Sequence, residues 1–183
     1  MTFEVELKYR ADDIDEDALR STLTNLGAQQ HAVISQCDRY FNHPGRDFGQ
    51  TDEALRIRQT DGQYRITYKG PKIDPIAKTR REIELSLADD DSGDKLAEIL
   101  LALGFRETLS VPKSRETWTF TWQGLAVEVV IDTIDQLGQF LELETTTDDD
   151  DTTPARDALL QLASTLGLHT VERRSYLEML LDE

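Results

Sequence analysis

Glu-x-Glu pairs, in which one residue separates two glutamates, occur at three places in the sequence. They are Glu4-Val5-Glu6, Glu82-Ile83-Glu84 and Glu142-Leu143-Glu144. Because side chains alternate between the two faces of an extended strand, both carboxylates of each pair point to the same side. Like charges gathered on one surface repel one another and persist only where cations neutralise them. The three pairs therefore predict a site that contains metal ions and basic side chains.

Basic residues follow the same alternating pattern. Arg56 and Arg58 form one pair, and Lys113 and Arg115 form another. Guanidinium and ammonium groups bind phosphate oxygens through charge-assisted hydrogen bonds, whereas carboxylates are the hard ligands that Mg²⁺ and Mn²⁺ prefer. The two sets together predict a site for a triphosphate-containing small molecule, with Mg²⁺ or Mn²⁺ as the cofactor.

The periodicity of the apolar residues predicts the elements that carry these side chains. Helical periodicity covers 15–26, 92–103 and 154–166, and a period of two covers 55–59, 63–69, 80–87, 115–122, 125–132 and 139–145. An N-terminal strand and one near Tyr40 bring the expected total to about eight strands. Asp61-Gly62 and Gln123-Gly124 are typical of tight hairpin turns, which favours a mostly antiparallel sheet.

These strands combine one apolar face with one charged face. The apolar face includes Val5, Ile83, Leu85 and Leu143, and we expect it to form the core. In an open sheet the charged face would meet solvent and would need no further explanation. Closure into a barrel would instead turn that face inward. Arg and Glu dominate it where solvent faces usually mix in Ser, Thr and Gln, which favours the closed barrel over the open sheet.

Length, charge and cysteine content limit the class of protein. The 183 residues suit a single domain spanning 1–183, and a net charge of −16 argues against a nucleic-acid partner. Cys37 is the only cysteine, so no intrachain disulfide forms, and no apolar run is long enough to cross a membrane. We expect a cytoplasmic protein without a membrane partner.

Other catalytic arrangements have little support. The three histidines lack the spacing of metal ligands, Cys37 has no evident partner base, and no glycine-rich phosphate-binding loop occurs.

An ordered series of motifs resembles the CYTH superfamily, the triphosphate tunnel metalloenzymes. The series runs through Glu4-x-Glu6-x-Lys8, Gln36-x-Asp38-x-Tyr40-Phe41, His43-Pro44, Asp47-Phe48, the run from Thr51 to Arg58, Lys69, Arg80-x-Glu82-x-Glu84, Lys113-x-Arg115, Asp132, Leu137-Gly138-x-Phe140-x-Glu142-x-Glu144 and Ser175-Tyr176-x-Glu178. Any single piece is weak evidence, because alternating charges are common. The ordered set covers nearly the whole chain and is specific.

The resemblance implies an α+β fold, a closed eight-stranded antiparallel β-barrel or tunnel with helices packed outside, and it also implies roles for individual residues. It implies an acidic, metal-binding set of Glu4, Glu6, Glu82, Glu84, Glu128, Asp132, Glu142 and Glu144. It implies a phosphate-binding set of Lys8, Arg56, Arg58, Lys69, Arg80, Lys113 and Arg115. In some hydrolytic members a pair resembling Tyr40 and Lys69 helps to activate water.

Within the superfamily the chain looks most like the class IV adenylyl cyclases, which convert ATP to cyclic AMP and pyrophosphate. The same lumen could instead direct water at the γ-phosphorus and give a triphosphatase for inorganic, nucleoside or thiamine triphosphate. A polyphosphate-binding module without catalysis is a third alternative, although six carboxylates would then repel the ligand unless metal were present. Residue types do not decide between these functions, and the oligomeric state, including a homodimer, stays open.

Overall fold

A nine-stranded antiparallel sheet forms the body of the molecule in the computed structural model, which describes residues 2–88 and 91–182. The strands are β1 (Phe3–Arg10), β2 (Gln29–Gln30), β3 (Ile34–Asn42), β4 (Ala54–Thr60), β5 (Gln63–Lys69), β6 (Arg80–Ser86), β7 (Arg106–Trp122), β8 (Leu125–Ile134) and β9 (Gly138–Thr147). The helices are α1 (Glu16–Asn25), α2 (Phe48–Thr51), α3 (Ser92–Ala102), α4 (Thr153–Thr165) and α5 (Tyr176–Leu181).

Eight of the strands close on themselves. Their order is β7-β3-β4-β5-β6-β1-β9-β8, and β8 pairs back onto β7. Strand β7 makes this closure possible because it is long: residues 106–115 pair with β3, and residues 114–122 pair with β8. The short strand β2 continues the β3 side by pairing with Thr119 and Trp118. The predicted barrel is therefore confirmed, and the charged face of the strands lines its lumen.

The two predicted hairpin turns are present. In the β4–β5 turn Asp61 and Gly62 have φ of 48° and 80°, and in the β7–β8 turn Gln123 and Gly124 have φ of 52° and 85°. Positive φ at both central residues matches the right-handed twist of the strands that the turn connects. These turns fix the register that brings the charged residues of neighbouring strands to the same face.

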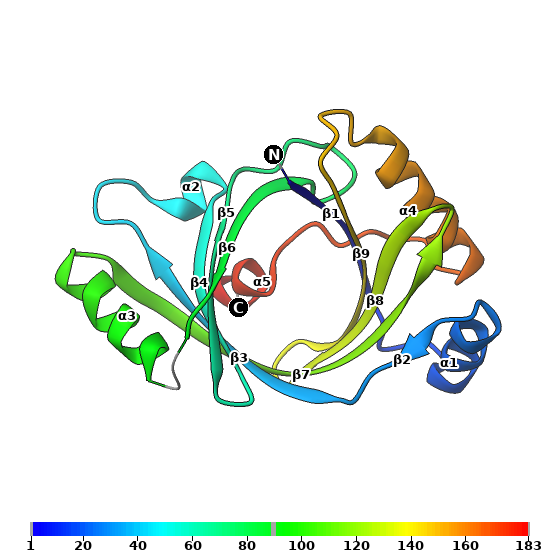
Figure 1. Ribbon diagram of the computed structural model, residues 1–183, viewed down its shortest axis with the longest axis horizontal. Coiled ribbons are helices and arrows are strands. Elements are labelled where there is room, and N and C mark those ends of the chain that lie inside the picture. Colours follow the sequence, from blue (N-terminus) through cyan, green and yellow to red (C-terminus); the bar gives the residue numbers. More distant parts are fainter. Residues whose placement is uncertain (1, 89–90, 183) are drawn as a thin grey trace.

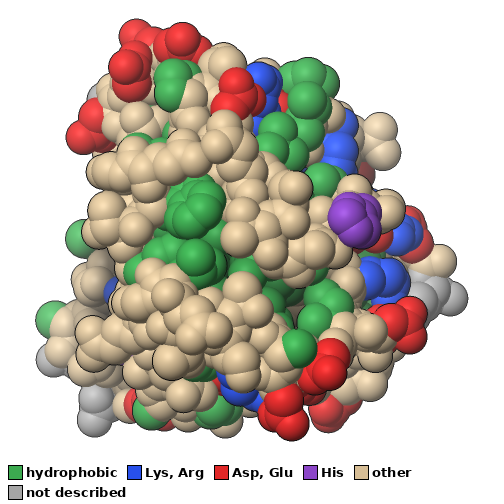
Figure 2. Space-filling view, turned by 90° about the vertical axis from the view of Figure 1, so that its right-hand side faces the viewer, with side chains coloured by type: hydrophobic (Ala, Val, Ile, Leu, Met, Phe, Trp, Pro, Cys, Tyr) green, Lys and Arg blue, Asp and Glu red, His purple; other side chains and the backbone are tan. Residues whose placement is uncertain are grey.

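The main core lies outside the barrel, beneath helices α1 and α4. It includes Val5 and Leu143 from the sheet and Leu159 and Leu162 from α4, all fully buried. The Trp122 side chain also donates from Nε1 to the Ala158 carbonyl oxygen at 3.0 Å, which ties β7 to α4. Figure 1 shows both helices on the same side of the barrel, and Figure 2 shows apolar side chains near the middle of that face with acidic groups at its edges.

One part of the expected core is wrong. Ile83 and Leu85 of β6 are 51% and 63% exposed, although their alternation matches that of buried strands. Helix α3 packs against β4 and β5, so the outer face of β6 stays in contact with solvent. Alternation predicts which face a residue occupies, but whether a helix covers that face depends on the tertiary structure.

Helix α5 was not predicted and lies apart from the outer helices. Figure 1 shows it between the β3–β4 side and the β1–β9 side of the barrel. Its Tyr176 and Met179 pack with Val111, Ile134 and Phe140 in a second apolar cluster. The helix begins with a capping box, in which the Ser175 hydroxyl accepts from the Glu178 amide and the Glu178 carboxylate accepts from the Ser175 amide. Residues of α5 therefore border the cavity inside the barrel.

We expect Leu159→Ala to lower the free energy of unfolding by about 2–5 kcal/mol, because it leaves a cavity between α4 and the sheet. Urea denaturation monitored by tryptophan fluorescence measures the change. Leu101→Ala, at a helix position that is half exposed, is the matched control and should change stability by less than about 0.5 kcal/mol. Equal losses of unfolding free energy in the two variants would contradict the assignment of Leu159 to the main core.

Candidate functional site

The lumen contains a cavity of about 520 Å³. Every residue that the sequence assigned to the site lines this cavity, except Asp132. The lining members of that set are Glu4, Glu6, Lys8, Tyr40, Arg56, Arg58, Lys69, Arg80, Glu82, Glu84, Lys113, Arg115, Glu128, Glu142 and Glu144. Residues from eight strands are thus brought to one shared cavity.

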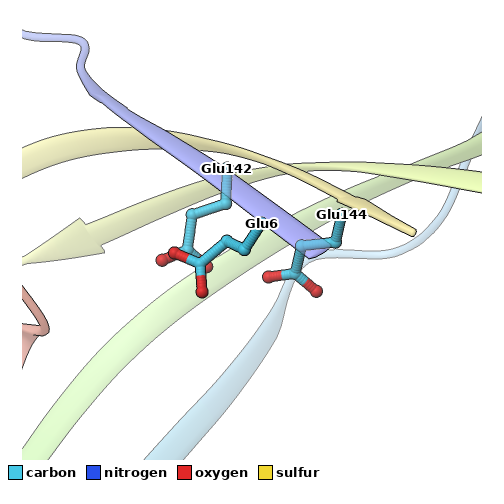
Figure 3. A group of neighbouring side chains, drawn as sticks. All are labelled: Glu6, Glu142 and Glu144. Carbon is cyan, nitrogen blue, oxygen red and sulfur yellow. The ribbon is translucent and has the colours of Figure 1, made fainter. Parts of the chain in front are cut away.

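Three glutamates converge on one side of the cavity, and we call them the acidic triad: Glu6 of β1 and Glu142 and Glu144 of β9. One carboxylate oxygen of each lies within 4.8 Å of the others, and Figure 3 shows the three groups pointing to the same side. Pairing of Glu6 with Glu144 across the two strands produces this convergence. Oxygen atoms at this spacing fit the coordination of Mg²⁺ or Mn²⁺.

The members of the acidic triad differ in their electrostatic surroundings. Burial, reinforced by the neighbouring carboxylates, raises the pKa of Glu144 well above its ordinary value even though Arg115 opposes this. Burial also disfavours the charged form of Glu142, yet Arg115 and Lys8 hold the pKa of Glu142 well below its ordinary value. A divalent cation would favour the ionised form of all three groups.

Four basic residues of β4 and β7 form a second cluster, which we call the basic wall: Arg56, Arg58, Lys113 and Arg115. It touches the acidic triad directly, because Arg115 Nη2 donates to Glu142 Oε2 at 2.8 Å. Strand β3 lies between β4 and β7 and supplies the counter-charge Asp38.

Asp38 is almost completely buried behind the basic wall. Arg58 donates two hydrogen bonds to its carboxylate, at 2.7 and 2.8 Å, and Arg56 Nη1 lies 3.5 Å from it. Burial opposes ionisation, but Arg56 and Arg58 hold the pKa of Asp38 far below its ordinary value. The buried Nε of Arg56 has no hydrogen-bond partner among the described residues. Arg56 therefore keeps a donor group in the site that an anionic ligand could use.

Asp132, which the resemblance places in the metal set, lies behind the other half of the basic wall. Arg115 donates to both of its oxygens at 2.7 and 2.6 Å, and Lys113 Nζ donates to Oδ2 at 2.9 Å. The Tyr176 hydroxyl adds a third donor to Oδ2 at 3.1 Å. The carboxylate is fully buried and engaged by cations, like Asp38.

Lys69 lies between two carboxylates from neighbouring strands. Its ammonium donates to Glu4 at 2.8 Å and also contacts Glu82. Burial opposes ionisation of Glu4, but Lys69 lowers the pKa of Glu4 to about 2. Burial and the charge of Glu4 outweigh the effect of Lys69 on Glu82 and raise the pKa of Glu82 to about 7. One ammonium thus neutralises only one of the two acids.

The remaining members of the predicted set lie around this centre. Glu84 is partly exposed and contacts Arg65 at 3.1 Å, Arg80 contacts Asp52 at 3.2 Å, and Glu128 is exposed. The Tyr40 ring packs in the apolar cluster beneath α5.

Lys78 is a site residue that the sequence did not reveal. It follows β5 in an irregular segment, so no alternation marks it, yet it is buried and its Nζ donates to Glu6 at 2.7 Å. Its backbone amide also donates to the Glu6 carbonyl oxygen at 2.9 Å, which holds the segment against β1. Lys78 therefore supplies a cation directly beside the acidic triad.

The sequence also matches a known protein family. The family model described as "CYTH domain" matches residues 2–176. The chain belongs to the CYTH family.

Curated relatives in this family carry cyclase names. A Methanocaldococcus jannaschii protein, named as a candidate adenylate cyclase, is 38% identical over 179 residues, which cover 96% of this chain and 97% of that protein. The adenylate cyclase CyaB of Aeromonas hydrophila is 33% identical over 180 residues, covering 95% of this chain and 86% of that protein.

Solved structures share this fold. The PH1819 protein of Pyrococcus horikoshii superposes with a TM-score of 0.85 at 42% identity, covering 98% of both chains. A Hippeastrum protein, described as a candidate adenylyl cyclase with a dominant triphosphatase activity, superposes with a TM-score of 0.68 at 15% identity, covering 100% of this chain and 96% of that chain. The second likeness extends to the fold alone.

No helix among the described residues is long and apolar enough to span a membrane.

We expect Asp38→Asn to lower the free energy of unfolding by about 3 kcal/mol at neutral pH, because Arg58 loses its buried counter-charge. Since the folded protein holds the pKa of Asp38 below its unfolded value of about 3.9, this contribution is present above that pH and is lost as the pH falls through the folded pKa. Urea titrations between pH 7 and pH 3 should show the gap between wild type and variant narrowing.

Glu107→Gln is the matched control for this charge. Glu107 also receives two hydrogen bonds from one arginine, Arg39, but on the outer surface of the barrel. Its loss should change stability by less than about 1 kcal/mol. A loss of stability for Asp38→Asn that is equally small, or that does not change with pH, would contradict the interpretation that Asp38 and Arg58 form a buried ion pair.

Proposed function

We propose that the protein is a divalent-metal-dependent enzyme that converts ATP to cyclic AMP and pyrophosphate inside the tunnel. The observation that carries this proposal is the direct contact of the acidic triad with the basic wall in one cavity of the barrel. The cavity volume of about 520 Å³ falls within the roughly 300–1,000 Å³ typical of sites for small-molecule ligands. The cyclase names of the relatives that are 38% and 33% identical support the same reaction.

The basic wall would bind the phosphates of the substrate. In the proposed reaction the ribose 3′-hydroxyl attacks the α-phosphorus and pyrophosphate leaves, so negative charge grows on the leaving group. Arg56, Arg58, Lys113 and Arg115 are already fixed by Asp38 and Asp132, and they can stabilise this charge without reorganising. Lys8, Lys69 and Arg80 would extend the phosphate contacts along the cavity.

The acidic triad would hold Mg²⁺ or Mn²⁺. Its three convergent carboxylates are a chemically suitable set of metal ligands. They also lie near the basic groups that would bind the phosphates of the substrate. The bound ion would neutralise phosphate charge and lower the pKa of the attacking hydroxyl. Glu4, Glu82, Glu84 and Glu128 remain proposed members of the acidic set. Asp132 contributes through Lys113 and Arg115, because both its oxygens already receive donors from these residues.

A triphosphatase is the second candidate, favoured by the activity described for the Hippeastrum protein of the same fold. Water would then attack the γ-phosphorus. In that reaction Lys69 would act as a cation and not as a base, because the adjacent carboxylates outweigh burial and raise the pKa of Lys69 above its ordinary value. Burial likewise raises the pKa of Tyr40, which keeps its phenol neutral.

Product analysis distinguishes the candidates. The purified protein is incubated with Mg²⁺ or Mn²⁺ and either ATP or inorganic triphosphate, and the cyclic nucleotide, pyrophosphate and orthophosphate are quantified. We expect cyclic AMP and pyrophosphate in equal amounts from ATP. Orthophosphate without cyclic AMP, together with ADP from ATP or with pyrophosphate from inorganic triphosphate, would support the triphosphatase. Tight metal-independent binding with no turnover would contradict both candidates.

Glu6→Gln should lower metal-dependent turnover by more than about 100-fold, because it removes a charged ligand while preserving the shape of the side chain. Steady-state kinetics at increasing Mn²⁺ concentrations measure the loss. Glu116→Gln is a suitable control, since Glu116 is a buried strand glutamate whose carboxylate contacts Arg20 outside the lumen. Full activity of Glu6→Gln would remove Glu6 from the metal site.

Arg56→Lys should weaken the binding of inorganic triphosphate about tenfold, because lysine keeps the charge but loses the planar set of donors. Isothermal titration calorimetry gives the dissociation constant directly. Arg39→Lys, at an arginine that pairs with Glu107 on the outer surface of the barrel, should bind as tightly as the wild type. Unchanged affinity of Arg56→Lys would show that its unpartnered Nε does not contact the ligand.

A further inference from the structure

The Ser175-Tyr176-x-Glu178 motif at the start of α5 has no role in the reaction as described so far. Its capping box fixes the first turn of the helix. Glu178 also accepts from Lys72 Nζ at 3.3 Å, and Lys72 contacts Asp52 at 2.9 Å. Two segments of the chain far apart in sequence therefore hold the helix in place at the lumen. This anchoring gives the Tyr176 side chain a fixed position.

The Tyr176 hydroxyl reaches the centre of the buried charge network. It donates to Asp132 Oδ2, the oxygen that also accepts from Lys113 and from Arg115 Nη2. A carboxylate rotates readily about its terminal torsion, so a third donor from a different direction helps to fix its plane. The orientation of Asp132 in turn sets where the long side chains of Lys113 and Arg115 point.

The ring of Tyr176 contacts a further cation of the site. The Lys8 ammonium lies 3.8 Å from the ring centroid, and the Lys113 ammonium lies 5.2 Å from it. Attraction between a cation and an aromatic face is strongest where water is excluded. The ring is itself held edge-on by Phe140 at 5.2 Å between centroids. Tyr176 thus contacts both lysines at this end of the cavity.

We propose that Tyr176 is a positioning residue that orders Lys8, Lys113 and Arg115 for polyphosphate binding. The hydroxyl acts through Asp132, and the ring acts on Lys8 directly. Flexible lysine and arginine side chains lose conformational entropy when they bind a ligand, and ordering them beforehand removes that cost. The inference rests on the proposed function, since it takes the basic wall to be the phosphate site.

Tyr176→Phe tests the hydroxyl while keeping the ring and the packing of α5. We expect its dissociation constant for inorganic triphosphate to rise about tenfold, as for the loss of one hydrogen bond to a charged group. KM for ATP should rise by a similar factor, and the midpoint of thermal unfolding should move little. Met179→Ala is the control: Met179 is an apolar residue buried on the same helix and in the same apolar cluster, so the variant should be less stable yet bind triphosphate normally.

A double-mutant cycle with Asp132→Asn separates positioning from a general structural effect. If the hydroxyl acts through Asp132, adding Tyr176→Phe to Asp132→Asn should change the dissociation constant less than twofold. Should Asp132→Asn fail to fold, Lys113→Met replaces it in the cycle. The loss of affinity caused by Tyr176→Phe should then be smaller than in the wild type, because Asp132 has only Arg115 left to position. Additive losses, or an affinity of Tyr176→Phe equal to that of the wild type, would overturn the positioning role alone. Failure of the wild type to bind triphosphate would overturn the proposed function and the positioning role together.

Discussion

Burial of opposite charges inside a closed barrel is the constraint on which the rest of the structure depends. Removing a charge from water costs several kcal/mol, and only good geometry with a partner offsets that cost. The lumen meets this requirement through chains of contacts, such as Lys113 to Asp132 to Arg115 to Glu142. The strand register, the two tight turns and the position of α5 all serve to bring these partners within hydrogen-bond distance.

The balance of positive and negative charge inside the tunnel differs from the net charge of the whole chain. The protein carries a net charge of −16, so its outer surface repels polyanions at long range. The basic wall is shielded from that surface by the barrel and by the elements that pack on it. An anionic ligand would therefore gain its binding energy inside the lumen, where a low dielectric strengthens each contact with arginine or lysine.

Alternation in the sequence, together with the resemblance to the CYTH superfamily, was enough to predict the barrel and most of the residues around its cavity. A period of two places Glu6 beside Lys8 and Glu142 beside Glu144 on one face, whatever the rest of the fold does. Lys78 and Tyr176 could not be found in this way, because they lie in an irregular segment and a short C-terminal helix. Their placement depends on how the chain returns across the barrel, as does the exposure of Ile83 and Leu85. Long-range packing determines those features, so the local periodicity of the sequence does not predict them.

Residue type alone also does not fix what a carboxylate does in the lumen. Glu4 and Glu82 share the same ammonium of Lys69, yet the pKa of Glu4 is lowered to about 2 and that of Glu82 is raised to about 7. Asp132 and Glu142 both contact Arg115, but Asp132 has no surface on the cavity and Glu142 does. Two acids that look equivalent in sequence therefore differ in charge or in access to a ligand. Their chemistry is decided by the neighbours that each strand register provides, which is why the acidic set divides into groups that can meet a metal ion and groups that hold the basic wall in place.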